Sequence, residues 1–300
     1  RSGAKDQILA PATGEAFAEA AHGTAADVDK ALDAAHAAAP AFGATTPAER
    51  ARLLNRIADR MEEHLEELAV AETWENGKAV RETLAADIPL AIDHFRYFAG
   101  AIRAQEGRLS QIDDDMVAYH FNEPLGVVGQ IIPWNFPLLM AVWKLAPALA
   151  AGNAVVLKPD SQTPLSAMLG AELLAEAGLP DGIFNVVTGR GSEVGQAITD
   201  ECDYLMFTGS TETGRSLAEQ VAPRLIDYSM ELGGKNPLIV ADDADIDRAV
   251  NGIWPACFGN SGQLCISIER IYVHRKVADK FIPAFVNRVK QLKVGGGTDW

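Results

Sequence analysis

Cysteine is scarce in this sequence, which has three in 300 residues. So few thiols, in an odd number, argue against a disulfide framework and fit a reducing compartment. Residues 1–12 also lack the basic-then-apolar pattern of a secretory signal. We therefore expect a cytoplasmic protein.

Long apolar runs and an excess of basic charge are missing as well. The longest apolar stretches are residues 127–132 and 138–151, and the second is interrupted by Lys144 and Pro147, so no membrane partner is expected. Acidic residues outnumber basic ones 41 to 26, giving a formal net charge of −15, which disfavours nucleic acid as a partner. The six histidines lack any paired-ligand spacing, so no metal is expected.

The hydrophobic pattern predicts an α/β fold. Residues 27–39, 47–67 and 72–104 have helical spacing, with breaks expected near Gly77 and Pro89. Residues 108–112 and 116–121 predict a hairpin with an acidic turn. From there on, the pattern predicts strands at 127–132, 154–157, 184–187, 204–207 and 238–240, and helices at 138–150, 164–177, 192–199 and 211–221. This alternation requires a parallel sheet covered on both faces.

A second α/β unit is predicted to start after Gly233. It contains the strand at 238–240, a helix at 245–258, a strand at 268–274 and a helix at 277–292. We therefore expect two domains, residues 1–232 and residues 233–300.

Ligands of an open parallel sheet lie beyond the carboxyl ends of its strands, so residues at those positions are candidates for a site. Asn135 follows the first strand between Pro133 and Pro137. These prolines would fix its amide as an oxyanion donor, although an Asn that caps the next helix explains the pattern equally well. Lys158 follows the second strand, where it would contact ribose or phosphate unless it is simply a surface lysine.

Two glycine-rich turns, residues 189–195 and 209–214, follow later strands. Glycine lets the backbone approach a pyrophosphate, and a following helix offers free N–H groups. Neither turn has the spacing of the dinucleotide fingerprint, and tight helix–sheet packing would also favour glycine.

Two side chains suit covalent catalysis. Glu231 lies in an apolar and glycine-rich segment that is poorly suited to a solvated salt bridge, and Cys265 follows Gly262-Gln263-Leu264 in a loop. A thiolate would attack the substrate and a carboxylate would then activate water. Cys202 and Cys257 lack such a setting, so we expect both to be small buried hydrophobes.

Four motifs, taken together, resemble the aldehyde dehydrogenase superfamily in order and approximate spacing, and the resemblance covers essentially the whole chain. The motifs are Pro133-Trp134-Asn135-Phe136-Pro137, Phe207-Thr208-Gly209-Ser210-Thr211, Glu231-Leu232-Gly233-Gly234-Lys235 and Gly262-Gln263-Leu264-Cys265.

The resemblance implies a fold and an assembly. Residues 1–232 would form a Rossmann-like cofactor domain with an oligomerisation hairpin near 108–122, and residues 233–300 would begin an α/β catalytic domain that is incomplete at its C-terminus. Because the hairpin resembles the family's subunit-bridging element, a homodimer or homotetramer is expected for the complete protein.

The resemblance also implies a reaction, the oxidation of an aldehyde with NAD or NADP. Cys265 would attack the aldehyde carbon, Asn135 and the backbone N–H of Cys265 would hold the oxyanion, and Glu231 would activate the water that hydrolyses the thioester. Lys158 would bind the adenosine ribose and Ser210 the pyrophosphate. The full set of implied cofactor-binding residues is Ile132, Pro133, Trp134, Lys158, Ser161, Gly191, Gly195, Phe207, Gly209, Ser210, Thr213 and Leu232.

Two departures from the family pattern bear on specificity. Ser161 stands where NAD-preferring members commonly have a Glu, so repulsion of a 2′-phosphate is absent and NADP should be accepted. Trp143 stands where many succinate-semialdehyde enzymes have a carboxylate-binding Arg. With Phe136 and Met140 it would form an apolar funnel for a small aliphatic aldehyde.

Three alternatives remain at this point. Residues 160–273 resemble succinate-semialdehyde dehydrogenases, which makes an NADP-dependent enzyme of that kind the second candidate. A CoA-acylating enzyme would use the same Cys265 but has little role for Glu231. Family members are longer than this chain, so a catalytically silent relative that only binds cofactor is the third candidate.

Overall fold

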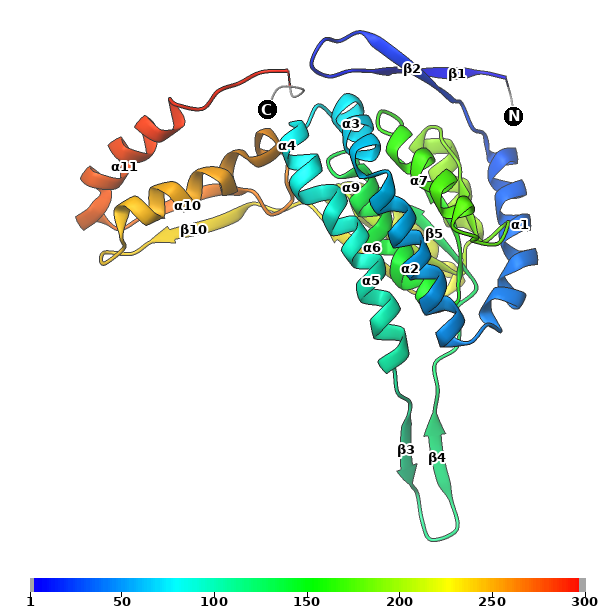
Figure 1. The fold of residues 1–300 in the computed structure, drawn as a ribbon. Helices are drawn as coiled ribbons and strands as arrows, with labels where there is room; N and C mark the ends of the chain where they lie inside the picture. The colour runs from blue at the N-terminus through cyan, green and yellow to red at the C-terminus, as the bar shows by residue number, and fades with distance from the viewer. Residues whose placement is uncertain (1–2, 297–300) are drawn as a thin grey trace.

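A five-stranded parallel sheet forms the centre of the molecule (Figure 1). The structure is a computed structural model that describes residues 3–296. The outermost residues of both expected domains lie outside the described residues. The strand order is β7-β6-β5-β8-β9. The strands are β5 (Val127–Ile131), β6 (Ala154–Lys158), β7 (Phe184–Val186), β8 (Tyr204–Gly209) and β9 (Tyr228–Leu232). β5 and β6 are buried along their whole length, as expected for parallel strands covered on both faces.

Helices cover both faces of this sheet. On one face α6 (Pro137–Ala150) and α7 (Leu165–Glu176) contact the strands, and α2 (Pro47–Glu63), α3 (Leu65–Asn76) and α5 (Ile88–Ala104) pack outside them. Across the other face lie α1 (Ala25–Gly43), α8 (Gln196–Glu201) and α9 (Thr211–Val221). The predicted α/β class with a parallel, Rossmann-like sheet is confirmed. Within residues 3–296, no helix has the length and apolar content needed to cross a membrane.

Several helix boundaries differ from the predicted ones. The expected helix over residues 47–67 is divided at His64, which lies between the end of α2 and the start of α3. The break near Gly77 is confirmed, since Gly77 ends α3 with a left-handed φ of 76°. The break near Pro89 is wrong, because α4 (Val80–Glu82), the π-helical η1 (Thr83–Asp87) and α5 follow one another directly. A wide turn just before Pro89 accommodates a residue that has no N–H to donate.

Short helical turns lie at three further places. The expected helix over residues 192–199 is a π-helical turn, η2 (Gly191–Gly195), followed by α8. A 3-10 turn, η3 (Ala222–Arg224), follows α9, and another, η4 (Gly259–Gly262), follows α10.

Two antiparallel hairpins lie outside the sheet. β3 (Arg108–Gln111) and β4 (Val117–His120) form the predicted hairpin, which projects far from the rest of the molecule (Figure 1). β1 (Lys5–Leu9) and β2 (Ala16–Ala21) form a hairpin that was not predicted, because alanine and charged residues dominate these strands.

The last part of the chain forms a smaller α/β unit. β10 (Asn236–Val240) and β11 (Ile268–Val273) are parallel and joined through α10 (Ile246–Phe258), and α11 (Arg275–Val289) follows. The unit has its own apolar cluster, which includes Val240, Ile253 and Phe281. It lies beside the main sheet (Figure 1).

Candidate active site

The candidate residues lie at the carboxyl ends of the strands. Because all five strands are parallel, these ends form one edge of the sheet. From β5 the chain moves to β6 and then β7 on one side, whereas β8 and β9 lie on the other side of β5. The strand order therefore reverses between β5 and β8, which is where open α/β sheets bind ligands. Asn135 follows β5, Lys158 ends β6, Ser210 follows β8 and Glu231 lies near the end of β9.

Lys158 is buried at this edge, with 4% of its surface exposed, so the surface-lysine alternative is wrong. Its Nζ donates to the Pro159 carbonyl at 2.7 Å. Burial lowers the pKa of the Lys158 ammonium, and Asp160 opposes part of that shift. Gly195 lies close to this lysine, since a Cβ added at Gly195 would be 3.6 Å from the Cδ of Lys158. Ser161 is exposed in the turn that follows.

The second glycine-rich turn leads into α9. The Ser210 hydroxyl caps the helix by accepting from the Thr213 N–H at 3.1 Å. At Gly214 an added Cβ would approach Leu232 Cδ2 to 2.7 Å, so α9 packs closely on β9 at this position. At Gly191 an added Cβ would meet nothing within 4 Å, so the first turn borders open space.

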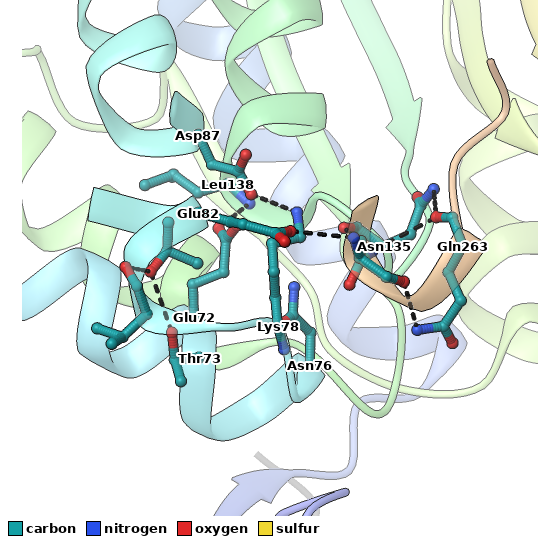
Figure 2. Close-up of polar contacts among 12 residues, drawn as sticks. Glu72, Thr73, Asn76, Lys78, Glu82, Asp87, Asn135, Leu138 and Gln263 are labelled. Carbon is teal, nitrogen blue, oxygen red and sulfur yellow. Dashed lines mark hydrogen bonds and ion pairs between the residues drawn. The ribbon is translucent and has the colours of Figure 1, made fainter. Parts of the chain in front are cut away.

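Asn135 is joined to the loop that carries Cys265. Its Nδ2 donates to the Gln263 carbonyl at 2.8 Å (Figure 2). In addition, the Asn260 Nδ2 donates to the Asn135 carbonyl at 3.3 Å. The helix-cap alternative for Asn135 is wrong, because Phe136 is the N-cap of α6 and no side chain caps that helix. Since an amide carries two N–H bonds, one holds Asn135 in place while the second stays available.

Cys265 has an exposed thiol and a firmly held backbone. The Asn236 Nδ2 donates to the Cys265 carbonyl at 2.7 Å and to the Ser267 carbonyl at 3.1 Å. At Gly234 an added Cβ would lie 2.8 Å from the Cys265 carbonyl oxygen. The segment just after Glu231 therefore contacts the residue that we expect to be the nucleophile. Sequence reasoning missed Asn236, although the preceding glycines signalled a close backbone approach.

Glu231 lies opposite Thr208 in the β8–β9 ladder. The Thr208 Oγ1 accepts from the Nζ of Lys144 at 2.5 Å. Burial lowers the pKa of Lys144 to about 8, and the charge of Glu231 opposes part of that shift. A cavity of about 560 Å³ is lined by Glu231, Lys144 and Trp143 among others. Sequence reasoning missed Lys144 as a neighbour of Glu231. The feature that could have indicated Lys144 is that it is a single charged residue within an apolar helix.

The three residues of the expected substrate funnel are not all brought to that cavity. Trp143 lines it, stacked with His94 at 5.6 Å between ring centroids. Met140, by contrast, is 3% exposed and belongs to the core. The Phe136 ring lies 3.5 Å from the Nζ of Lys78 and packs on the same core.

The other two thiols differ from Cys265. Cys202 is buried and Cys257 is partly buried, and burial raises the pKa of both. In residues 3–296, no group of three His, Cys, Asp or Glu side chains is arranged to hold a metal ion.

The parallel sheet with polar residues at its strand ends defines an α/β protein of the Rossmann-like type, and comparison with known proteins identifies the family. Residues 2–300 match the model of the aldehyde dehydrogenase family, so the chain belongs to that family.

Among its relatives, an aldehyde dehydrogenase of Deinococcus radiodurans is 57% identical over 96% of this chain and 57% of the relative. A fluoroacetaldehyde dehydrogenase of Streptantibioticus cattleyicolor is 56% identical over 96% of this chain and 58% of the relative. An NAD+ complex of a Bacillus cereus aldehyde dehydrogenase superposes with a TM-score of 0.97 at 41% identity, covering 99% of this chain and 61% of the other. The chain thus spans less than two thirds of the length of these relatives.

Proposed function

We propose that this chain carries the nucleotide site and the nucleophile of an NAD(P)-dependent oxidation of an aldehyde to a carboxylic acid. The observation that carries the proposal is the hydrogen bond from Asn135 to Gln263, which ties an amide donor to the loop of Cys265. In this proposal residues 1–232 bind the nucleotide and residues 233–300 begin the catalytic domain.

The chemistry of the strand-end residues fits a dinucleotide. Lys158 supplies an ammonium, Ser210 a hydroxyl, and the first turn of α9 its backbone N–H groups. Gly191 borders open space, which leaves room for a ligand, and Gly195 lies against Lys158. The printed name of the Bacillus cereus complex includes NAD+, which supports the same cofactor here. The other residues assigned to this site are Ile132, Pro133, Trp134, Ser161, Phe207, Gly209, Thr213 and Leu232.

In the first step the Cys265 thiolate attacks the carbonyl carbon, an S–C bond forms and the carbonyl electron pair moves to oxygen. The second N–H of the Asn135 amide and the backbone N–H of Cys265 donate to that oxyanion. As the electron pair of the oxyanion re-forms the C=O bond, a hydride leaves the substrate carbon and a thioester on Cys265 remains. A nicotinamide dinucleotide held by Lys158 and Ser210 would supply the acceptor for that hydride. Glu231 then takes a proton from water, which attacks the thioester on Cys265, and breaking of the S–C bond returns the thiolate and releases the acid.

We propose a small, uncharged aliphatic aldehyde as the substrate. Trp143 lines the cavity with an indole surface where a carboxylate-bearing substrate would need a cation, whereas Phe136 and Met140 pack in the core and do not line it. One relative is named for fluoroacetaldehyde, a small uncharged aldehyde, which supports this choice. We further propose a cytoplasmic homodimer or homotetramer for the complete protein.

The test is the appearance of reduced nicotinamide, followed by near-ultraviolet absorbance, with NAD or NADP and acetaldehyde or succinate semialdehyde. Cys265→Ala is expected to abolish turnover while leaving nucleotide binding intact. Cys257→Ala is the matched control, since it removes a thiol eight positions away that has no assigned role, and it should retain turnover. Nucleotide binding without turnover in the folded parent chain would contradict the proposal and identify a catalytically silent relative.

A further inference from the structure

The turn that precedes Cys265 has an unusual backbone. Asn260 and Ser261 have φ values of 47° and 57°, and Gly262 follows at 81°. Non-glycine residues rarely adopt this left-handed region, and two in succession persist only where the surroundings hold them. The contacts that hold this turn therefore determine where Cys265 lies.

Asn260 makes most of these contacts, and only 6% of its surface is exposed. Its backbone N–H donates to Glu82 Oε2 at 3.0 Å. Its side-chain Nδ2 donates to the Asn135 carbonyl at 3.3 Å and more weakly to the Gln263 carbonyl at 3.4 Å. The Gln263 side chain donates back to the Asn260 carbonyl at 3.0 Å. Asn260 thus connects Glu82, the oxyanion-donor loop and the nucleophile loop.

Glu82 is presented from a rigid support. It ends α4 just before the π-helical turn, and two residues that flank it, Lys78 and Asp87, form a buried ion pair. The Lys78 ammonium lies over the ring of Phe136, the residue next to Asn135. The Thr83 hydroxyl, adjacent to Glu82, bonds to the Thr73 hydroxyl of α3 at 3.0 Å. One support therefore positions both the Asn135 loop and the Glu82 carboxylate.

We propose that Glu82 and Asn260 are positioning residues for the nucleophile: they hold the left-handed turn that sets Cys265 against Asn135. This inference rests on the proposed function. Glu82 does not reach the reacting atoms; it acts through a charge-assisted hydrogen bond to one backbone N–H. Loss of that bond frees the turn to relax toward ordinary φ values, which moves the Cys265 backbone N–H away from the oxyanion position.

The first measurement is hydrogen–deuterium exchange of the peptide spanning residues 258–265, which needs no turnover. Glu82→Leu removes the acceptor and should speed exchange in this peptide at least tenfold, whereas Glu82→Gln retains an acceptor oxygen and should stay close to the parent. Glu219→Leu makes the same change at an exposed helical position with no recorded contact to the turn and should alter nothing. Unchanged exchange in Glu82→Leu would overturn the proposal, whether or not the chain turns over.

The second measurement is the split between kcat and KM. Misplacement of a reacting group on the order of 1 Å costs up to about a hundredfold in rate, so Glu82→Leu should lower kcat tenfold to a hundredfold. The KM for the nucleotide should stay within twofold, because Lys158 and Ser210 are untouched, and Glu82→Gln should recover most of kcat. An equal decrease of kcat in Glu82→Leu and Glu82→Gln would assign Glu82 a different role. Absence of turnover in the parent chain would count against the proposed function alone, since the exchange experiment still decides the positioning role.

Asn260 is tested with Asn260→Gly. Glycine adopts the left-handed conformation without strain and keeps the N–H that donates to Glu82, so this variant removes only the side-chain hydrogen bonds to the Asn135 and Gln263 carbonyls. We expect a lower kcat with an unchanged thermal midpoint, whereas a kcat equal to that of the parent would remove Asn260 from the proposal.

Discussion

At the scale of single residues, the neighbours of Cys265 hold its backbone and leave its side chain free. Asn236 and Gly234 both contact the Cys265 carbonyl, and no recorded hydrogen bond within the described residues engages its Sγ. A nucleophile needs this combination, since its backbone N–H must stay aimed at the oxyanion while the sulfur turns toward the substrate. The amide of Asn236 does this by spanning two carbonyls, those of Cys265 and Ser267.

Ser161 provides a prediction about the cofactor. It is exposed three residues after the buried Lys158, with Pro159 and Asp160 between them. Ser161→Glu introduces a carboxylate that would repel a 2′-phosphate, so the ratio of kcat/KM for NAD to that for NADP should rise at least tenfold. Ser161→Gln is the uncharged control of the same size and should change the ratio by less than threefold. An equal change of this ratio in both variants would show that the size of the side chain, rather than its charge, determines the cofactor preference.

Trp143 provides a prediction about the substrate. Trp143→Arg places a guanidinium where bidentate contact with a carboxylate is possible. We expect kcat/KM for succinate semialdehyde to rise and that for acetaldehyde to fall, each about tenfold, in the same absorbance assay. Trp143→Leu removes the indole without adding charge and should not favour succinate semialdehyde. A gain for succinate semialdehyde in the Leu variant would contradict an electrostatic cause.

At the scale of secondary-structure elements, the sequence predicted what local patterns determine. β5 and β6 are continuous apolar runs, and Gly77 ends its helix because a left-handed residue is needed there. β9 escaped prediction because it is a partly exposed edge strand containing Ser229 and Glu231. The π-helical turn over Thr83–Asp87 escaped because it depends on tertiary packing around Asp87 rather than on local preference.

The candidate site was predictable to a similar degree. Asn135, Glu231 and Cys265 each stand out locally, by flanking prolines or by glycine-rich surroundings. Glu82 and Asn260 do not, because their hydrogen bond joins residues 178 positions apart. Such a contact leaves no trace in local spacing, so only the folded arrangement reveals it.

Glu75 joins two elements and makes stability depend on pH. Its buried carboxyl group at the end of α3 accepts from the Leu165 N–H at 2.6 Å and the Ser166 N–H at 3.0 Å, at the start of α7. Burial raises the pKa of Glu75 to about 7 from 4.5, although the hydrogen bonds from Ser166 and Leu165 oppose the shift. Between these two values the folded state keeps a proton that the unfolded state has lost. The free energy of unfolding therefore falls as pH rises through this window.

Glu75→Gln should remove that component. We expect the drop in unfolding free energy from pH 5 to pH 8 to be smaller by about 2 kcal/mol in the variant than in the parent. Denaturant-induced unfolding at pH 5 and at pH 8 measures this difference in unfolding free energy. Glu66→Gln, an exposed change on the same helix, should keep the slope of the parent. A slope in Glu75→Gln equal to that of the parent would mean that Glu75 ionises normally in the folded state.

At the scale of the whole molecule, apolar surface is concentrated on the projecting hairpin. Leu109, Tyr119 and Phe121 are 71%, 67% and 67% exposed, and Leu109 lies directly opposite Tyr119 in the ladder. A two-stranded hairpin is marginally stable alone, and within residues 3–296 no further strand pairs with either of its edges. Another subunit that covered this apolar face would stabilise the hairpin, as the proposed homodimer or homotetramer requires.

Leu109→Lys tests this assembly, because burying a lysine against an apolar partner surface is costly. Sedimentation of the complete protein should give a dimer or tetramer for the parent sequence and a shift toward monomer for Leu109→Lys, with the subunit dissociation constant raised at least tenfold. Leu225→Lys makes the same change at the residue that follows η3, which is 92% exposed. This control variant should sediment like the parent. If both variants sediment like the parent, the assembly does not use the hairpin. If both dissociate, added charge rather than position is the cause, since only Leu109 lies on the surface that we expect another subunit to cover.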